Sequence, residues 1–122
     1  MIDGVSFIRD CYPVVNNSND QVRYRDLYHP DILWCPPNLP DKRGIDIVAF
    51  AYGLKDFHIY VEVIELEGVN SIDMSYVTGL VKVDTFKKDG KEQIDSLVLR
   101  GSWLIVEHEG RLCIRYQVWN QK

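Results

Sequence analysis

The sequence has little of what marks several large classes of proteins. No apolar run approaches the roughly 20 residues that cross a bilayer, and the N-terminus lacks the basic start and apolar stretch of a signal peptide. Basic residues are outnumbered, with 14 lysines and arginines against 18 acidic residues and a net charge of −4. Because phosphate binding needs a basic face, this balance argues against nucleic acid as a partner. We therefore expect neither a membrane nor a nucleic-acid partner.

Cysteine and histidine are also scarce. The three cysteines, Cys11, Cys35 and Cys113, are odd in number and widely spaced, which suits neither a disulfide framework nor a zinc signature. They indicate reduced thiols in a cytoplasmic protein. The three histidines are too scattered for a metal pattern, and no nucleophile elbow, glycine-rich phosphate loop or paired-cysteine motif is present. We expect no metal and no cofactor.

What is present is the composition of one ordinary globular domain. The chain has 122 residues, of which 46% are hydrophobic and 26% charged. This length supports a single core and leaves no room for a second domain, so residues 1–122 are expected to form one unit.

The first half of the chain carries helical spacing. Apolar residues predict a helix over about residues 3–12, with a kink or short continuation at Pro13. The asparagine-rich segment 16–20 has the composition of a turn. A second short helix is expected over 22–28, and a third over 45–54, whose wide apolar stripe indicates burial on most sides.

The second half reads as four long strands. A short strand over 32–35, which ends at Pro36-Pro37, precedes them. The long strands are expected from His58 to a turn at 68–71, and over 72–86, 92–107 and 111–120, with turns at Asp89-Gly90 and Glu109-Gly110. Their alternation is imperfect, so both sheet faces are expected to be partly covered, one by the helices and the other by a partner subunit.

Several short motifs in a fixed order carry a resemblance to a family. They are the segment Tyr28 to Gly44, with its Trp-Cys-Pro-Pro stop and its Arg-Gly helix opening, then Met74 to Gly79, Arg100-Gly101, and Val118 to Asn120. Together they resemble SnoaL-like proteins of the nuclear-transport-factor-2-like superfamily, which includes ketosteroid isomerase. The resemblance covers nearly the whole chain. It implies an α+β cone, in which about three N-terminal helices pack in a strongly curved, mostly antiparallel sheet, and usually a homodimer.

The catalytic pattern of ketosteroid isomerase does not carry over. The position of its aspartate base falls at or next to Pro36, and that of its oxyanion-hole acid falls near Gly101 or Ser102. Only its tyrosine has a match, since Tyr12 stands eight residues before Asp20 as the family spacing requires. Without a positioned base, steroid-type enolisation is not expected.

The resemblance predicts which strand residues face a pocket in the cone. The expected substrate-binding residues are Trp34, Tyr52, Tyr60, Tyr76, Thr78, Arg100, Ser102, Gln117 and Trp119, with Leu80, Lys82 and Leu104 on the same faces. Aromatic walls with a few convergent polar groups are typical of small-molecule sites. The alternatives stay open: the arginines would face solvent or pair with Glu62, Asp95 or Glu107, and the tryptophans would pack in an ordinary core.

Three residues are candidates for chemistry. Tyr12 could donate to a carbonyl oxygen, and the guanidinium of Arg115 could meet a carboxylate or an enolate. His58 shares a strand face with Glu62, and a histidine side chain suits proton transfer. Further candidate bases are Glu62, Asp95 and His29.

Three functional hypotheses follow. The first is a protein that binds a small, apolar, oxygen-bearing molecule in the cone and that could catalyse an isomerisation, cyclisation or dehydration by proton transfer. The second is a non-catalytic binding or dimerisation module, because no clear replacement for the missing base is present. The third is epoxide or ester hydrolysis, which needs two acids and an arginine to converge.

Overall fold

The computed structural model describes residues 1–37, 39–48, 57–88 and 91–121. Two helices, α1 (Gly4–Ser18) and α2 (Gln21–Asp26), come first in the chain. The strands are β1 (Tyr28–Cys35), β2 (Lys42–Arg43), β3 (Phe57–Asn70), β4 (Met74–Lys87), β5 (Gln93–His108) and β6 (Arg111–Gln121). A third helix begins at Ile45, where predicted, and is described as far as Val48.

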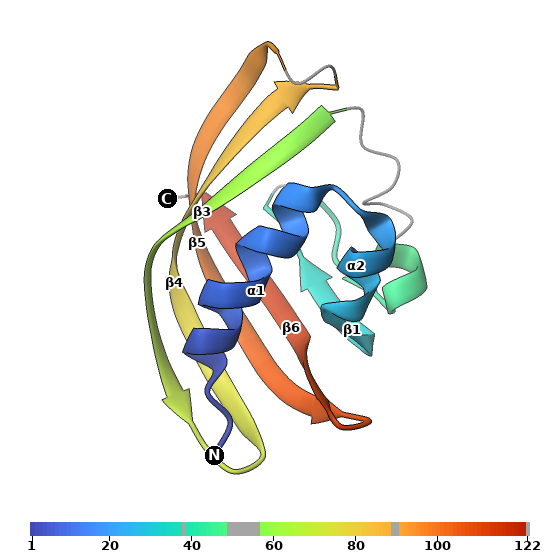
Figure 1. The fold of residues 1–122 in the computed structure, drawn as a ribbon, viewed down its shortest axis with the longest axis vertical. Helices are drawn as coiled ribbons and strands as arrows, with labels where there is room; N and C mark the ends of the chain where they lie inside the picture. The colour runs from blue at the N-terminus through green and yellow to red at the C-terminus, as the bar shows by residue number, and fades with distance from the viewer. Residues whose placement is uncertain (38, 49–56, 89–90, 122) are drawn as a thin grey trace.

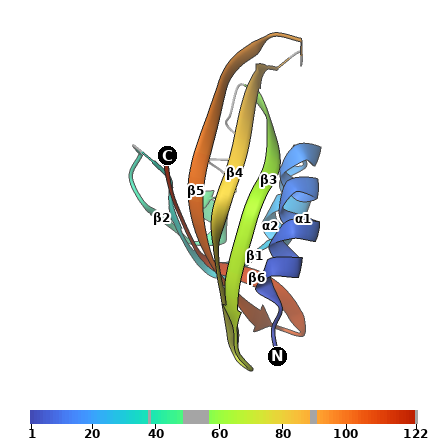
Figure 2. The same ribbon diagram turned by 90° about the vertical axis from the view of Figure 1, so that its left-hand side faces the viewer.

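All described strands belong to one curved sheet. Their order is β2-β1-β6-β5-β4-β3, in which β1 runs parallel to β6 and every other neighbouring pair is antiparallel. The helices lie on one face of this sheet, which bends around α1 (Figure 1). Seen from the side of β3, β4 and β5, the opposite face carries no described helix (Figure 2). The expected α+β cone is confirmed, and we name these two faces the inner face and the outer face.

Bulges and glycines allow the sheet to bend. The register shifts between Val63 and Glu65 on β3, and again where Leu104 and Ile105 of β5 meet β6. Gly79 of β4 pairs with Gly101 of β5, and the indole of Trp103 lies over Gly101, where a Cβ would come within 2.4 Å of the ring. β-bulges bend a strand, and glycines without a Cβ let neighbouring groups approach closely where a sheet curves.

Helix α1 is longer than the sequence predicts. The Asp3 side chain caps it by accepting from the backbone N–H of Ser6 at 3.1 Å, and the helix then continues through Pro13 to Ser18. A mid-helix proline costs a backbone hydrogen bond. The helix continues because its last turn is held from outside, by β3.

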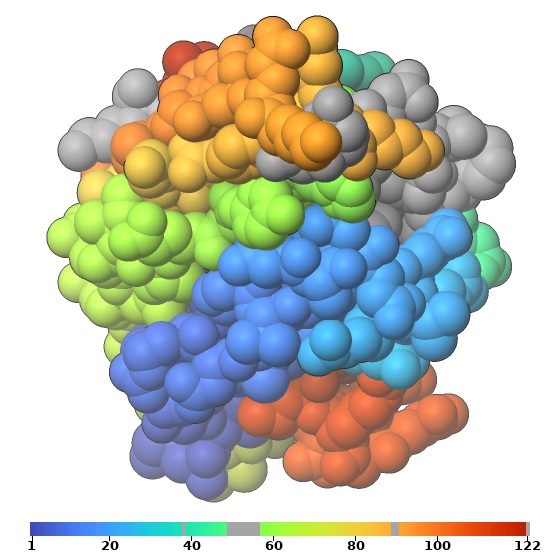
Figure 3. Space-filling view, turned by 45° about the horizontal axis from the view of Figure 1, so that its top comes forward, coloured from blue at the N-terminus to red at the C-terminus, as the bar shows by residue number. Residues whose placement is uncertain are grey.

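Asparagine side chains pin the end of α1 to β3, which is the edge strand of the sheet. The Asn17 amide donates to the carbonyl oxygen of Val61 at 3.1 Å and accepts from the Val61 N–H at 2.6 Å. Asn19 makes the same pair of contacts with Ile59, at 3.4 and 3.5 Å. Helix and strand lie side by side on the molecular surface (Figure 3). In the segment 16–20, where a turn was predicted, the helix therefore continues to Ser18, and the chain turns at Asn19, with φ 53°.

Other boundaries move for similar reasons. Helix α2, capped by Asp20, stops at Asp26, because the chain then joins β6 through a hydrogen bond from the Ile114 N–H to the Leu27 carbonyl oxygen at 2.9 Å. Strand β3 runs to Asn70, through the predicted turn at 68–71, because Gly68 packs against Val5 of α1. The predicted turn at Asp89-Gly90 lies outside the described residues.

The core lies between the helices and the inner face. Its fully buried large side chains include Ile8 of α1, Tyr28 and Ile32 of β1, Trp103 of β5 and Ile114 of β6. The three cysteines are all unbridged: Cys11 is exposed, Cys35 half-buried and Cys113 buried. Within the described ranges, no helix has the length and apolar character needed to cross a bilayer.

Candidate functional site

A cavity of about 340 Å³ opens at one end of the cone. It lies among α1, α2, the β1–β2 segment, the start of β3 and the end of β6. The described lining residues are Asn16, Tyr24, Trp34, Pro36, Pro37, Leu39, Lys42, Phe57, Ile59 and Trp119. The two indoles meet edge to face, with ring centroids 5.7 Å apart. Such a wall, mostly aromatic and apolar with a few polar groups, is typical of a small-molecule site.

Local chain geometry explains why Lys42 reaches this cavity. The two prolines that follow Cys35 end β1, and the chain returns antiparallel as the two-residue strand β2. Gly44, with φ 94°, then donates its N–H to the Ile32 carbonyl oxygen at 2.8 Å and fixes the return. Lys42 is thereby placed opposite Trp34, and its side chain lies on the inner face.

A group of buried polar side chains lies deeper in the cone. The Tyr28 hydroxyl donates to Gln117 Oε1 at 2.8 Å, and the Tyr12 ring meets the Trp103 indole edge-on at 5.4 Å. Burial above all, and then the neighbouring Tyr24, raises the pKa of Tyr12 and of Tyr28 well above the ordinary 10.0. Both therefore keep their protons and act as neutral hydroxyls near pH 7.

The sequence matches no known family profile and no curated protein. Solved structures do match. A nuclear transport factor 2-like superfamily protein from Salmonella enterica is 12% identical, with a TM-score of 0.82, over 97% of this chain and 88% of that one. The chain has the nuclear-transport-factor-2-like fold. The SnoaL-like subfamily itself stays a prediction.

Two further structures share this nuclear-transport-factor-2-like fold. An uncharacterised protein with a cystatin-like fold from Caulobacter vibrioides is 20% identical, with a TM-score of 0.78, over 97% of this chain and 87% of the other. A ketosteroid isomerase-like protein from Erwinia carotovora is 17% identical, with a TM-score of 0.71, over 97% and 92% of the two chains. At these identities the likeness concerns the fold.

Some of the predicted site residues do lie on the inner face of the nuclear-transport-factor-2-like cone. Trp34 and Trp119 line the cavity, whereas Gln117 and Tyr12 are buried beneath it. The predicted Tyr52 lies outside the described residues. The sequence reasoning missed the lining residues Asn16, Tyr24, Lys42, Phe57 and Ile59. One sequence signal pointed toward Lys42: the Trp-Cys-Pro-Pro segment ends β1, and the chain then turns back as β2, which carries Lys42.

Five predicted binding residues lie on the outer face, away from the cavity: Tyr60, Tyr76, Thr78, Arg100 and Ser102. The neighbours expected on the same faces, Leu80, Lys82 and Leu104, lie there too. The Tyr76 hydroxyl donates to Ser102 Oγ at 3.1 Å across the outer face. The inward face of β4 was misjudged because both alternating sets of its residues contain apolar side chains. The set that faces inward is Val77, Gly79 and Val81.

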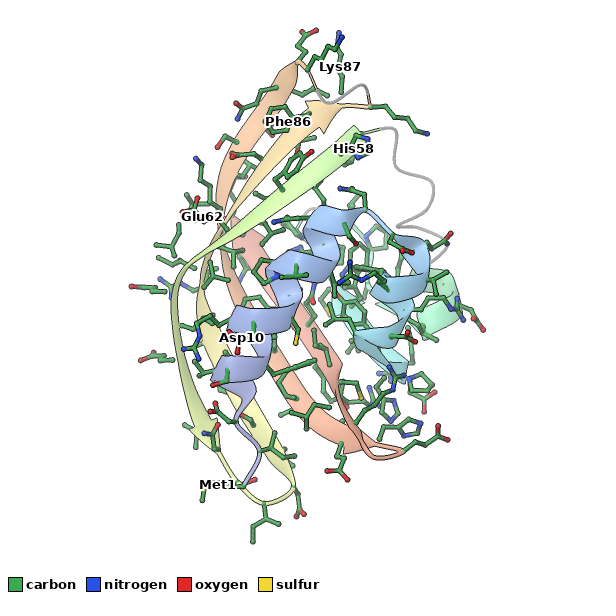
Figure 4. All side chains as sticks on the ribbon, in the orientation of Figure 1. Met1, Asp10, His58, Glu62, Phe86 and Lys87 are labelled. Atoms are coloured by element: carbon green, nitrogen blue, oxygen red, sulfur yellow. The ribbon has the colours of Figure 1, made fainter. Side chains whose placement is uncertain are left out.

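The three candidate catalytic residues do not converge. A bulge in β6 makes Arg115 the extra residue, and its guanidinium donates to the Asp31 carbonyl oxygen on β1 at 2.6 Å. His58 lies near the start of β3, and its register places it on the outer face with Tyr60 and Glu62, which points away from α1 (Figure 4). Tyr12, on the buried side of α1, lies in the core. Among the residues that the structure describes, no three histidine, cysteine or acidic side chains are grouped as metal ligands would be.

The candidate base His29 lies in β1. Its ring meets that of His108 edge-on at 4.5 Å, and its Nδ1 accepts from the Asp31 N–H at 2.9 Å. Burial first, then the charges of His108 and Arg115, lowers the pKa of His29 below 6.5, against a smaller opposing effect of Asp31.

We expect this histidine to make folding pH-dependent. A pKa that is lower in the folded than in the unfolded chain means that the unfolded chain binds more protons, so stability falls as the pH drops from 6.5 through the folded pKa. A His29→Gln variant should lose less stability over that window than the wild type, in urea unfolding at pH 7.5, 6.5 and 5.5. Equal losses in the two proteins would contradict the assignment.

Proposed function

We propose that this protein binds a small, apolar, oxygen-bearing molecule in the cone. The observation that carries the proposal is the 340 Å³ cavity, whose walls are the edge-to-face pair Trp34 and Trp119 together with Phe57 and Ile59. Aromatic side chains supply large contact areas, and the Lys42 ammonium supplies a donor for an oxygen. The fold shared with a ketosteroid isomerase-like protein is in keeping with a ligand held inside the cone.

Binding is favoured over proton-transfer catalysis. Isomerisation, cyclisation and dehydration need a group that accepts a proton at neutral pH. The described lining contains neither a carboxylate nor an imidazole, and burial keeps the nearby Tyr12 and Tyr28 protonated. Hydrolysis has less support still, because Arg100 and Arg115 do not line the cavity. The non-catalytic binding module is therefore the better-supported form of the proposal.

A neutral fluorescent probe tests the proposal. N-phenyl-1-naphthylamine should bind the wild type with an enhanced, blue-shifted emission. Ile59→Trp should lower its affinity at least about tenfold, because the larger side chain fills the cavity. The matched control is Ile64→Trp, on the same strand but 50% exposed and absent from the described lining. It should leave the affinity unchanged.

Two results would overturn binding in this cavity. One is the absence of probe binding by the wild type. The other is equal binding by the wild type and Ile59→Trp, provided that thermal unfolding shows Ile59→Trp to be folded under the assay conditions.

We also propose that two copies associate through the outer face. One row of apolar side chains crosses five strands there: Leu33 of β1, Tyr116 of β6, Leu104 of β5, Tyr76 of β4 and Val69 of β3. Three of them, Val69, Tyr76 and Tyr116, are exposed. A contiguous apolar row on a sheet face without a described helix is typical of a protein interface, and aromatic residues are enriched there.

The remaining expectations stay predictions. They are the cytoplasmic location, the absence of a cofactor and the absence of nucleic-acid and membrane partners.

A further inference from the structure

Four side chains form one polar row across the inner face. Lys42 of β2 pairs with Trp34 of β1, Trp34 pairs with Gln117 of β6, and Gln117 pairs with Trp103 of β5. Directly paired residues project to the same face of a sheet, so these four side chains are lateral neighbours. The row starts at the cavity wall, which Lys42 and Trp34 line, and ends in the core at Trp103.

This row contains buried hydrogen-bond donors. Trp34 Nε1, Gln117 Nε2 and Trp103 Nε1 are buried, and none makes a hydrogen bond of ordinary geometry with the residues that the structure describes. The inner two, on Gln117 and Trp103, face the hydroxyl of Tyr12 and lower its pKa against the larger effect of burial. Lys42 is the charged member of the row, and it lies at the cavity wall.

The charge at the cavity has one sign. Lys42 is half-buried, and it makes no ion pair with any described residue. The described lining holds no aspartate or glutamate that would neutralise it. The adjacent Asp41 acts on the thiol of Cys35, which projects to the other face of β1. Lys42 is thus the charged side chain of the described lining, and no acidic side chain of that lining balances it.

We infer that the ligand of the cone is an organic acid, whose carboxylate lies against the Lys42 ammonium. Its apolar body lies against Phe57, Ile59 and Trp119. This inference rests on the proposed binding function and adds the charge of the ligand to it. A charge-assisted hydrogen bond in a half-buried site favours the anion over a neutral isostere of the same shape.

Two small probes of matched shape test the charge. We expect 1-naphthylacetate to bind about tenfold more tightly than the neutral 1-naphthylacetamide, by calorimetry at pH 7.5 and low salt. The preference should shrink at high salt, because part of it is screened. Lys42→Met should remove the preference while it keeps the amide affinity, and Lys42→Arg should retain it. The matched control is Arg43→Met, which removes the adjacent cation from the opposite face of β2.

Each outcome decides between the two proposals. Equal affinities for acid and amide in the wild type, or an unchanged preference in Lys42→Met, would overturn the inference. An equal loss of preference in Arg43→Met would do the same, since it would show a general field effect. If N-phenyl-1-naphthylamine binds and neither naphthyl compound does, the inference is wrong and the binding function stands. If no probe binds, both are wrong.

Discussion

Replacement of Gly79 by alanine is expected to destabilise the protein by about 3 kcal/mol. A Cβ at this position would come within 2.1 Å of the carbonyl oxygen of Glu65 and within 3.0 Å of the Leu66 Cα. Both contacts are with the backbone of β3, at the bulge that bends the sheet, so no side-chain rotation relieves them. The two strands would have to separate locally and lose ladder hydrogen bonds. Chemical unfolding at a fixed protein concentration, followed by tryptophan fluorescence, measures the loss.

Gly110→Ala is the matched control for this prediction. Gly110 has φ 80°, but no atom lies within 4 Å of a Cβ built there. Its replacement should cost about 1 kcal/mol through backbone strain alone. The proposed role of Gly79 in strand curvature is wrong if the two variants lose the same stability.

A charge at Tyr76 should convert a dimer into monomers. Tyr76 is 48% exposed in the apolar row on the outer face, between Leu104 and Val69. Tyr76→Arg would bring two arginines into the interface, where each loses hydration without gaining a partner. Light scattering should give twice the 14.2 kDa chain mass for the wild type, and the mass of one chain for the variant at micromolar concentration.

Val14→Arg is the control, since Val14 is 53% exposed on α1, on the other side of the molecule. This variant should remain a dimer. A monomeric wild type, or dissociation caused equally by both changes, would rule out association through the outer face.

Some features of the structure could not be predicted from local sequence signals, because they depend on contacts between distant segments. The sequence left open whether α1 kinks or continues at Pro13. It continues because the side chain of Asn17 pairs with the backbone of Val61, 44 positions away in the sequence. Strand β2 has only two residues and exists because the edge of β1 accepts it. Lys42 therefore could not be assigned to the site from its neighbours alone, although it became the residue on which the ligand inference depends.

The predictions that were confirmed depend on short-range causes. The first two helices begin close to where predicted, and Asp3 and Asp20 cap them through contacts within three residues. Glu109 and Gly110 both adopt positive φ and make the last turn where predicted. In the third long strand the choice of face was wrong: Arg100, Ser102 and Leu104 were expected to point inward, but Leu97, Leu99, Trp103 and Ile105 form the inner face.

The sequence by itself determined the order, type and approximate length of the elements, and with them the nuclear-transport-factor-2-like cone. Only the tertiary structure decided which side chains enter the cavity. The reason is that side chains alternate along a strand, so one extra residue, such as Arg115 in β6, exchanges the two faces beyond it. Where the two alternating sets are not clearly separated, as in β4, the choice is made by the room that Gly79 leaves for the backbone of β3 and that Gly101 leaves for the Trp103 ring.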